Sequence, residues 1–328
     1  SGKIYCQRCF RLRHYNEITD VHISDDDFLK LLHEVGDSRT LVVNVIDIFD
    51  FNGSVIPGLQ RFISSSDLLL VGNKADILPK SVKSGKITQW LMERAHEEGL
   101  RPLDLILISA QNKWAIKELI AKIEELRQGR DVYVVGVTNV GKSTLINAII
   151  QEITGDKNII TTSRFPGTTL DKIEIPLNDG SYIFDTPGII HRHQMAHYLS
   201  DTALKYISPK TYQLNPEQTL FLGGLARFDY VTGDKQGFTA YFDNNLKLHR
   251  TKLAGADTFY DKHIGSLLTP PDKKEMAAFP KLVRHEFTIK EKTDLVFSGL
   301  GWIRINGRAK IAAWAPEGVA VVTRKALI

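Results

Sequence analysis

The amino-acid sequence predicts an α/β fold, with a mostly parallel, doubly wound sheet followed by a smaller β-rich α+β C-terminal domain. Three observations support this prediction. Continuous apolar runs in the first part of the chain are typical of strands buried on both faces of a parallel sheet. Helix-patterned segments separate several of these runs, which indicates βαβ units. After about residue 210 the apolar runs become short and alternating, as in antiparallel sheets.

The elements follow in order along the chain. A first helix is expected over 24–36, with Ser24 as its cap and Gly36 as its stop. Buried strands are then expected at TLVVNVIDI (40–48), DLLLVGNKAD (67–76), LDLILISA (103–110) and DVYVVGV (131–137). Helices over 86–99 and 114–129 place apolar residues at i, i+3, i+4 and i+7. In the C-terminal part, 302–314 is the best hairpin, because Asn306-Gly307 would supply the two positive-φ residues of a type I′ turn.

Composition limits the class of protein. The 328 residues, 43% of them hydrophobic and 24% charged, suggest a globular protein of about two domains. No apolar run reaches the roughly 18 residues of a membrane helix and no secretion leader is seen, so a cytoplasmic protein without a membrane partner is expected. The net charge of +4 is uneven, because residues 201–328 carry 19 Lys and Arg against 13 Asp and Glu. This surplus is compatible with a polyanionic partner and equally with a solvated surface.

The stretch GVTNVGKST (136–144) predicts a phosphate-binding loop. The spacing Gly136-x4-Gly141-Lys142-Ser143 follows an apolar strand and precedes an apolar helix pattern. The glycines allow backbone N–H groups to surround phosphates, Lys142 neutralises their charge and the Ser143 hydroxyl can bind Mg²⁺. The candidate phosphate-contacting residues are Asn139, Val140, Gly141, Lys142, Ser143 and Thr144.

Two other stretches point to guanine. In NKAD, which follows the strand at 67–72, Asp76 can accept from N1–H and the exocyclic amino group of guanine, donors that adenine lacks as a pair. Asn73 would brace this loop and Lys74 would cover the base. The stretch Ser109-Ala110-Gln111 ends another strand, where the Ala110 N–H can meet the guanine oxygen. Asp76 disfavours an ATP-dependent kinase or ATPase.

A switch is predicted after the phosphate loop. In DTPG (185–188), Asp185 suits a position just outside the direct ligands of Mg²⁺, and the Gly188 N–H can bind a γ-phosphate and lose this bond on hydrolysis. The linker FPGTTLD before it carries Thr168 and Thr169, either of which can reach Mg²⁺ once the loop is ordered.

These motifs resemble those of the translation-factor-like GTPases, but in the order base, base, phosphate, switch, switch. The loops that bind a nucleotide lie at the carboxyl ends of parallel strands, so they can meet whatever their order in the chain. The first domain is therefore expected to be a circularly permuted P-loop GTPase domain. An N-terminal cysteine pair followed by RLRHYNEI, together with FSGLGWI near the C-terminus, is similar to the YqeH family of ribosome-assembly GTPases.

The resemblance implies a GTP- and Mg²⁺-dependent hydrolase that acts in biogenesis of the small (30S) ribosomal subunit. It also implies a C-terminal domain that contacts rRNA or a ribosomal protein. The expected domains are a zinc-finger remnant (1–22), the permuted GTPase domain (23–210) and the β-rich RNA- or protein-binding domain (211–328). The family's zinc finger uses two cysteine pairs, whereas this chain has only Cys6 and Cys9. Two thiolates cannot close a tetrahedral Zn²⁺ site, so His14, His22 or an external ligand would be needed. Two unliganded thiols are expected instead.

The residues expected to act in hydrolysis are Lys142, Asn139, Thr169 and Gly188. Ile189 occupies the position where Ras-like enzymes have the glutamine that orients water, so turnover is expected to be slow. The Asn139-x-Gly-Lys-Ser pattern is similar to that of GTPases in which the asparagine helps to hold an activating K⁺. The alternative is that Asn139 only bonds the loop backbone. A monomeric GTPase is the favoured interpretation, and a GTP-dependent binding scaffold with negligible hydrolysis is the alternative.

Cations and aromatic residues mix in the C-terminal domain: Arg304, Arg308, Lys310, Arg324 and Lys325 lie near Trp302 and Trp314 in the sequence. This mixture is compatible with RNA binding. A two-residue loop at Asn306-Gly307 would divide the cations between both faces of a hairpin, so an ordinary sheet with exposed cations and core tryptophans is the favoured account of this hairpin taken alone.

Overall fold

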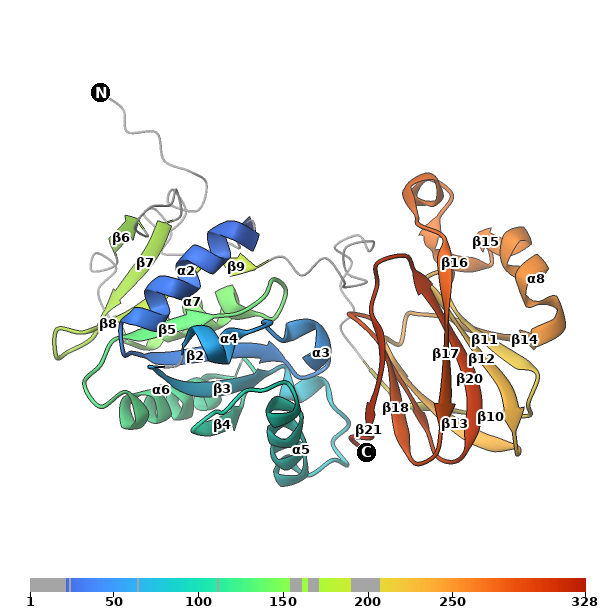
Figure 1. Ribbon diagram of the computed structural model, residues 1–328, viewed down its shortest axis with the longest axis horizontal. Coiled ribbons are helices and arrows are strands. Elements are labelled where there is room, and N and C mark those ends of the chain that lie inside the picture. The colour runs from blue at the N-terminus through green and yellow to red at the C-terminus, as the bar shows by residue number, and fades with distance from the viewer. Residues whose placement is uncertain are drawn as a thin grey trace. The chain divides into compact units, whose positions relative to one another are not determined.

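The computed structural model describes residues 22–23, 25–63, 65–110, 112–153, 161–164, 171–189 and 207–328. The chain divides into two compact units (Figure 1). One lies within Ser1–Asp76 and Lys83–His191, and the other within Ile77–Val82 and Arg192–Ile328. None of the described helices is long and apolar enough to cross a membrane.

The first unit is built on a seven-stranded sheet. Across the sheet the strands are β4 (Asp104–Leu107), β3 (Asp67–Asn73), β2 (Leu41–Asp47), β5 (Val132–Val135), β8 (Tyr182–Asp185), β7 (Asp171–Pro176) and β6 (Thr161–Arg164). The strands from β4 to β8 are parallel, while β7 runs antiparallel to β8 and β6 antiparallel to β7. Every residue of β2 and of β5 is buried, as expected of strands covered on both faces. The predicted mostly parallel sheet is confirmed.

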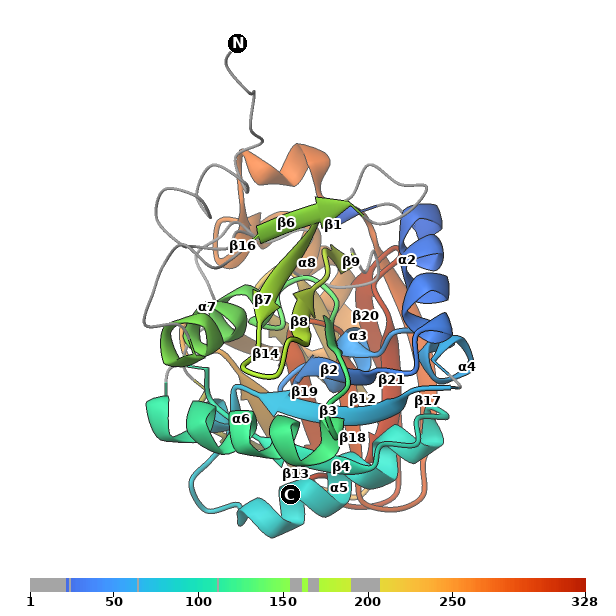
Figure 2. The same cartoon turned by 90° about the vertical axis from the view of Figure 1, so that its left-hand side faces the viewer.

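Helices cover both faces of this sheet. They are α2 (Asp25–Asp37), α3 (Phe51–Ser54), α4 (Leu59–Phe62), α5 (Ser84–Glu97), α6 (Lys113–Arg127) and α7 (Lys142–Ile153), with the 3-10 turn η1 (Ala75–Ile77). Figure 2 shows α6 and α7 on one side of the sheet and α2 and α4 on the other. The predicted apolar face of α6 is confirmed, because Ile116, Leu119 and Ile123 are buried. Asn112 caps this helix by accepting from the N–H of Trp114 at 3.0 Å.

Helix α2 ends one residue beyond the stop predicted at Gly36. Gly36 lies inside its last turn, and no side chain fits there because a Cβ atom would overlap the carbonyl oxygen of Phe62 in α4. The glycine is therefore required by the close approach of two helices rather than by the end of one.

The order of the strands creates a crevice. The chain runs outward from β2 through β3 to β4 and then returns to the centre, where β5 pairs with β2. From β2 the chain continues toward the β4 edge of the sheet, whereas from β5 it continues toward the β6 edge. In open α/β sheets, ligands bind at the carboxyl ends of the strands at such a switch point.

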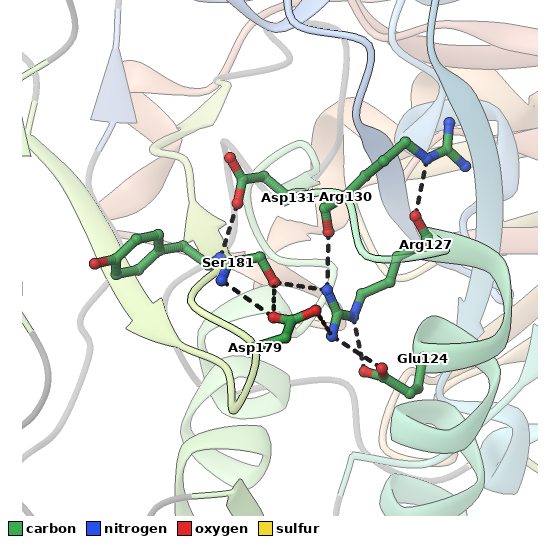
Figure 3. Close-up of polar contacts among 7 residues, drawn as sticks. Glu124, Arg127, Arg130, Asp131, Asp179 and Ser181 are labelled. Atoms are coloured by element: carbon green, nitrogen blue, oxygen red, sulfur yellow. Dashed lines mark hydrogen bonds and ion pairs between the residues drawn. The ribbon is translucent and has the colours of Figure 1, made fainter.

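The opposite end of the sheet is held by a polar network around Arg127, the last residue of α6 (Figure 3). The buried Arg127 guanidinium donates to Glu124 at 2.7 Å, to Asp179 at 2.8 Å and to the Ser181 hydroxyl at 2.6 Å. Asp131 accepts from the Tyr182 N–H at 2.8 Å. The network therefore joins the end of α6 and the start of β5 to the turn between β7 and β8.

The second unit is a sandwich of two five-stranded sheets, in which all neighbouring strands are antiparallel. One sheet has the order β10 (Lys210–Leu214), β13 (Gln236–Phe242), β19 (Gly301–Ile305), β18 (Thr293–Phe297) and β21 (Val321–Lys325). The other has β14 (Leu248–Lys252), β11 (Gln218–Leu222), β12 (Ala226–Gly233), β20 (Ala309–Pro316) and β17 (Leu282–Ile289). Phe228, Phe238 and Phe297 belong to the buried cluster between the sheets. The predicted β-rich C-terminal region is confirmed.

Smaller elements complete both units. In the second unit they are η3 (Leu253–Gly255), α8 (Ala256–His263), β15 (Ile264–Gly265), β16 (Leu268–Asp272) and η4 (Glu275–Ala278). In the first, the short strand β1 (His22–Ile23) pairs in parallel with β9 (Gly188–Ile189).

The hairpin predicted over 302–314 is wrong. Strand β19 pairs with β13 and β18, whereas β20 pairs with β12 and β17, so the two segments lie in different sheets. Neither Asn306 nor Gly307 has a positive φ, which excludes a type I′ turn. The Asn306 amide instead donates to the Gly237 carbonyl at 2.9 Å, and the Gly307 N–H donates to Gln236 at 3.0 Å. These bonds fix the chain where it passes from one sheet to the other.

Candidate nucleotide-binding site

The predicted site residues cluster at the carboxyl ends of the parallel strands. Asp47 ends β2, Asn73 ends β3 and Asp185 ends β8, while Ser109 follows β4 and Gly136 follows β5. This is the end of the sheet that holds the switch point between β2 and β5. Loops that are far apart in the sequence therefore share one edge of the sheet.

The phosphate loop connects β5 to α7, which begins at Lys142. Two residues of this loop have a positive φ, Asn139 at +66° and Gly141 at +84°. Gly141 also lies so close to the Asn73 amide that a Cβ atom would overlap it, which makes glycine necessary at this position. Because the first N–H groups of α7 have no partner within the helix, this end of the helix is suited to an anion.

Asn73 links three loops. Its amide group donates to the Val140 carbonyl at 2.9 Å, and its amide oxygen accepts from the Ala110 N–H at 3.1 Å. The side chain is only 2% exposed. A buried amide with both ends bonded is held in one orientation. Asn73 is therefore fixed against both the Val140 loop and the Ala110 loop.

Lys74 makes a second connection to the phosphate loop. Its ammonium group donates to the Asp47 carboxylate at 2.8 Å and to the Asn139 carbonyl at 2.9 Å. Asp47 is itself fixed, because its other carboxylate oxygen accepts from the Phe49 N–H at 2.9 Å. Asp47 was missed by the sequence analysis, although an acidic residue at the end of a mostly apolar strand run is a signal that could have found it.

The residues expected to read the base are more open to solvent. Asp76 lies in η1 and is exposed, while Ser109 and Ala110 are partly buried. A cavity of about 350 Å³ lies between α6 and α7, and both Ala110 and Thr144 line it. Ala110 belongs to the predicted base loop and Thr144 to the first turn of α7. The cavity therefore touches both parts of the predicted site, while its other lining residues belong to α6 and α7.

Lys142 and Asp185 form a buried pair. The Lys142 ammonium lies 2.6 Å from the Asp185 carboxylate and also donates to the Thr186 carbonyl. The Lys142 side chain is 5% exposed and that of Asp185 is fully buried. A charged pair of this kind brings the lysine of the phosphate loop and the first residue of DTPG to one point.

The donor set fits Mg²⁺. Ser143 in the first turn of α7 offers a hydroxyl and Asp185 a carboxylate, and both are hard oxygen ligands of the kind Mg²⁺ prefers. Within the described ranges, no group of three His, Cys, Asp or Glu could hold a metal. A Mg²⁺ ion bound mainly by phosphate oxygens and water does not need such a group.

Gly188 packs beside the phosphate loop. A Cβ atom on this buried glycine would lie 3.4 Å from Thr138 Cγ2, which is ordinary contact. In the β1–β9 pair, Gly188 lies opposite His22 at the start of the described chain. The predicted switch glycine is thus next to the loop whose nucleotide it is expected to sense.

Several predicted site residues lie outside the described residues. They are Cys6, Cys9, Gln111, Thr168 and Thr169. The cations predicted in the C-terminal part divide between the two sheets of the sandwich. Arg304 and Arg324 are on one sheet near Trp302, and Lys310 is on the other, with Arg308 just before it. Trp302 is 1% exposed, whereas Trp314 is partly exposed and lies under the Arg227 guanidinium at 4.5 Å.

Known proteins resemble the chain along its whole length. Residues 235–327 match a family model described as YqeH-like, C-terminal, and residues 131–215 match one described as 50S ribosome-binding GTPase. The YqeH protein of Bacillus subtilis is 58% identical over 333 aligned positions, which cover 99% of this chain and 91% of the relative. NO-associated protein 1 of Arabidopsis thaliana is 30% identical over 363 positions, covering 95% of this chain and 64% of that protein.

A solved structure of GNP-bound YlqF from T. maritima is also similar. It is 23% identical, covers 55% of this chain and 61% of its own, and superposes with a TM-score of 0.33.

Proposed function

Because the chain belongs to the YqeH family of circularly permuted GTPases, we propose that it is a GTP-hydrolysing switch protein that acts in assembly of the small (30S) ribosomal subunit. The observation that carries the nucleotide site is the pair of hydrogen bonds made by Asn73. They connect the loop expected to read guanine to the loop expected to hold phosphates. A site of this kind serves one ligand that has a base at one end and phosphates at the other.

Each loop has a role in this proposal. Asn73, Lys74, Asp76, Ser109, Ala110 and Gln111 bind the guanine, and Asn139, Val140, Gly141, Lys142, Ser143 and Thr144 bind the phosphates. Ser143, Asp185 and Thr168 or Thr169 would hold Mg²⁺, which would supply charge neutralisation at the β- and γ-phosphates. Lys142 stabilises the charge that develops on the transferred phosphoryl group. The Gly188 N–H bonds the γ-phosphate and releases it after hydrolysis, which makes DTPG the switch.

Hydrolysis is proposed to be slow and stimulated by K⁺. Ile189 has no group that can orient the attacking water. The Asn139 side chain makes no hydrogen bond to any described residue, and its backbone is fixed by the positive φ and by Lys74, so its amide oxygen is available to a cation. The test compares steady-state GTP turnover in K⁺ and in Na⁺ at equal ionic strength. Equal rates, or an Asn139→Ala variant with an unchanged response to K⁺, would remove this part of the proposal.

The partner is proposed to be a precursor of the small subunit, contacted through rRNA or a ribosomal protein by the C-terminal domain. Residues 235–327 of this domain match the family model described as YqeH-like, C-terminal. The GTPase family model carries the 50S subunit in its description, so the choice of subunit needs a direct test. The protein is sedimented with ribosomal particles in GTP analogue and in GDP. Nucleotide-dependent association with 30S particles is expected, and association with 50S particles alone would contradict the proposal.

A second candidate function is a GTP-dependent scaffold that binds RNA or protein with negligible hydrolysis. The position of Ile189 favours it, because a hydrophobic residue there leaves water activation to a group outside the motif. Single-turnover hydrolysis with and without small subunits separates the two functions. No detectable turnover in either condition would favour the scaffold.

The remaining parts of the proposal concern the whole chain. We propose domains at 1–22, 23–210 and 211–328. We also propose that the protein is a monomer and acts in the cytoplasm, where ribosomal precursors occur in bacteria. Zn²⁺ is proposed only where further ligands join Cys6 and Cys9. Metal analysis of the purified protein after dialysis tests this point, and stoichiometric zinc would contradict the expectation of unliganded thiols.

A further inference from the structure

An open cleft of about 460 Å³ lies at one end of the second sheet of the C-terminal unit. It forms where β12 ends at Gly233, β17 ends at Ile289 and β20 begins at Ala309. The residues that line it are Thr232, Gly233, Thr288, Ile289, Lys290, Arg308, Ala309 and Lys310.

The strand register places a cation between two hydroxyl groups. Lys310 is the direct partner of Thr232 on β12 and of Thr288 on β17. The next residue pair, Ala309 and Ile289, belongs to the buried core of the sandwich. Because successive side chains on a strand point to opposite faces, Lys310 and its two threonine partners point away from the core.

The charge of the cleft is unbalanced. Lys290, Arg308 and Lys310 are all exposed, and no described carboxylate forms an ion pair with any of them. No acidic side chain lines the cleft. Asp234 and Glu291 are close in sequence to the lining but are not part of it.

The backbone that carries these cations is held in place. The Gln236 amide donates to the Arg308 carbonyl at 3.2 Å, and its oxygen accepts from the Gly307 N–H at 3.0 Å. A bulge between Tyr230 and Thr232 shifts the register of β12 here. Gly233 then adopts a φ of +147°, and a Cβ atom on it would overlap the Tyr230 hydroxyl. The cleft is thus built by specific backbone features, which are common next to binding sites.

We propose that this cleft binds the phosphate groups of an RNA strand. The cations are spread along an open cleft rather than enclosed in a dry pocket, which suits successive phosphates of a polymer better than one free phosphate ion. Exposed cations bind nucleic acid mainly by releasing its counterions, so they do not need to be buried. The choice of RNA over another polyanion rests on the proposed function, whereas the assignment of phosphates rests on the cleft alone.

The test uses the full chain with GDP bound and a short, labelled single-stranded oligouridine as the probe. Binding is measured by fluorescence anisotropy over about 50 to 200 mM KCl for the wild type and for a triple variant, Lys290→Ala, Arg308→Ala, Lys310→Ala. The matched control removes three other exposed cations of the same unit, Lys247, Lys252 and Lys262, each to Ala. Both triple variants lose the same charge, and their melting temperatures verify folding.

The cleft variant is expected to lower the slope of log affinity against log salt by about 2, since each phosphate contact of a single strand contributes about 0.7. The control should keep the wild-type slope. An equal decrease of this slope in both triple variants would show that only net charge matters, and it would overturn the proposal. Displacement of the RNA by inorganic phosphate at matched ionic strength would show that the cleft binds the free ion. This result would contradict the proposed binding of an RNA strand.

Two further outcomes separate this inference from the proposed function. A cleft variant that binds RNA normally but no longer sediments with ribosomal particles would assign the cleft to a protein and overturn the inference. Binding of labelled GDP is measured on the same variants and is expected to be unchanged. A wild type that does not sediment with ribosomal particles would contradict the proposed function. The oligonucleotide binding would then still decide whether the cleft binds RNA.

Discussion

The amide of Asn73 connects two loops of the proposed nucleotide site. It donates to the Val140 carbonyl and accepts from the Ala110 N–H. The sequence predicts that Asn73 braces a loop, because NKAD follows a buried strand. It does not predict the partners, because Val140 is 67 residues away in the chain and becomes a neighbour only through the sheet.

Guanine selection can be tested at Asp76. Asp76→Asn is expected to lower GDP affinity at least tenfold, because the amide keeps one acceptor oxygen and turns its NH2 group toward the other guanine donor, which is left unpaired. Xanthine has an oxygen where guanine has its amino group, so the same variant is expected to bind xanthosine diphosphate better than the wild type does. Competition against a labelled nucleotide measures both affinities. A variant that loses both ligands alike would indicate a folding defect, and unchanged GDP affinity would exclude Asp76 from the base site.

Asp47 shows where reasoning from residues alone ends. An acidic residue at the end of an apolar run has many possible partners, and only the parallel pairing of β2 with β3 brings it to Lys74. Once there, it holds the lysine stem in the position expected to cover the base, while the Asn139 carbonyl binds the same ammonium group. Asp47 is therefore a positioning residue in the proposed site.

Asp47→Asn is expected to weaken GDP binding about tenfold, because Phe49 N–H and Lys74 use different oxygens of the Asp47 carboxylate. When the amide oxygen keeps the Phe49 bond, the NH2 group faces the Lys74 ammonium and the ion pair is lost. The amide can keep the bond from the Phe49 N–H, so folding should be retained. The control is Asp104→Asn, which removes a more exposed pair with Lys122 away from the phosphate loop. Isothermal titration with GDP measures the effect. Equal affinities for the two variants would exclude the positioning role.

At the level of elements, the Arg127 network holds the turn between β7 and β8 to the end of α6 (Figure 3). Hydrogen bonds from the Ser181 side chain and backbone, and then from Arg127, lower the pKa of Asp179 to about 2. The folded pKa lies below the unfolded value of about 3.9, so the contribution to stability is present above that pH and is lost as the pH falls toward 2. Asp179 is exposed, so solvent limits the size of this contribution.

Ser181→Ala removes the largest cause of this shift, so the pKa of Asp179 should rise toward its ordinary value. The variant is expected to be less stable than the wild type at neutral pH, with a difference that narrows between about pH 4 and pH 2. Urea midpoints across this range measure the effect. Ser266→Ala, at an exposed serine of the other unit, serves as the control. A difference that stays constant with pH would disconnect Ser181 from the titration of Asp179.

Strand existence was easier to predict than strand pairing. The apolar runs located β2, β3, β4 and β5 because burial on both faces leaves a continuous signal. The Asn306-Gly307 pair predicted a hairpin from local turn chemistry, yet β19 and β20 each pair with other antiparallel strands in separate sheets. The side chain of Gln236, which binds both sides of this connection, is distant in sequence, so no local pattern could reveal it.

For the whole molecule, the permuted order of the nucleotide-binding loops follows from one connection in the chain. A GTPase domain in the usual order would begin at the strand before the phosphate loop and end with the helix after the SAQ-type loop, here β5 and α6. In this chain residues 128–131 connect the two directly, and the Arg127 network surrounds that connection. Domain termini commonly lie close together at the surface, so a short connection can join them. Such a connection leaves the ligand site at the other end of the sheet unchanged.

Each unit buries a core of its own, which gives a prediction for the whole chain. In scanning calorimetry, GDP with Mg²⁺ is expected to raise the melting transition of the first unit only, because a ligand stabilises the structure that binds it. The gain is about 2.7 kcal/mol at a free concentration one hundred times the Kd. ATP should give no comparable shift. The Asp76→Asn variant is the control for binding at the proposed site and should lose most of the GDP effect. A shift of both transitions by GDP would show that nucleotide binding stabilises the C-terminal unit as well, so the two cores would not unfold independently.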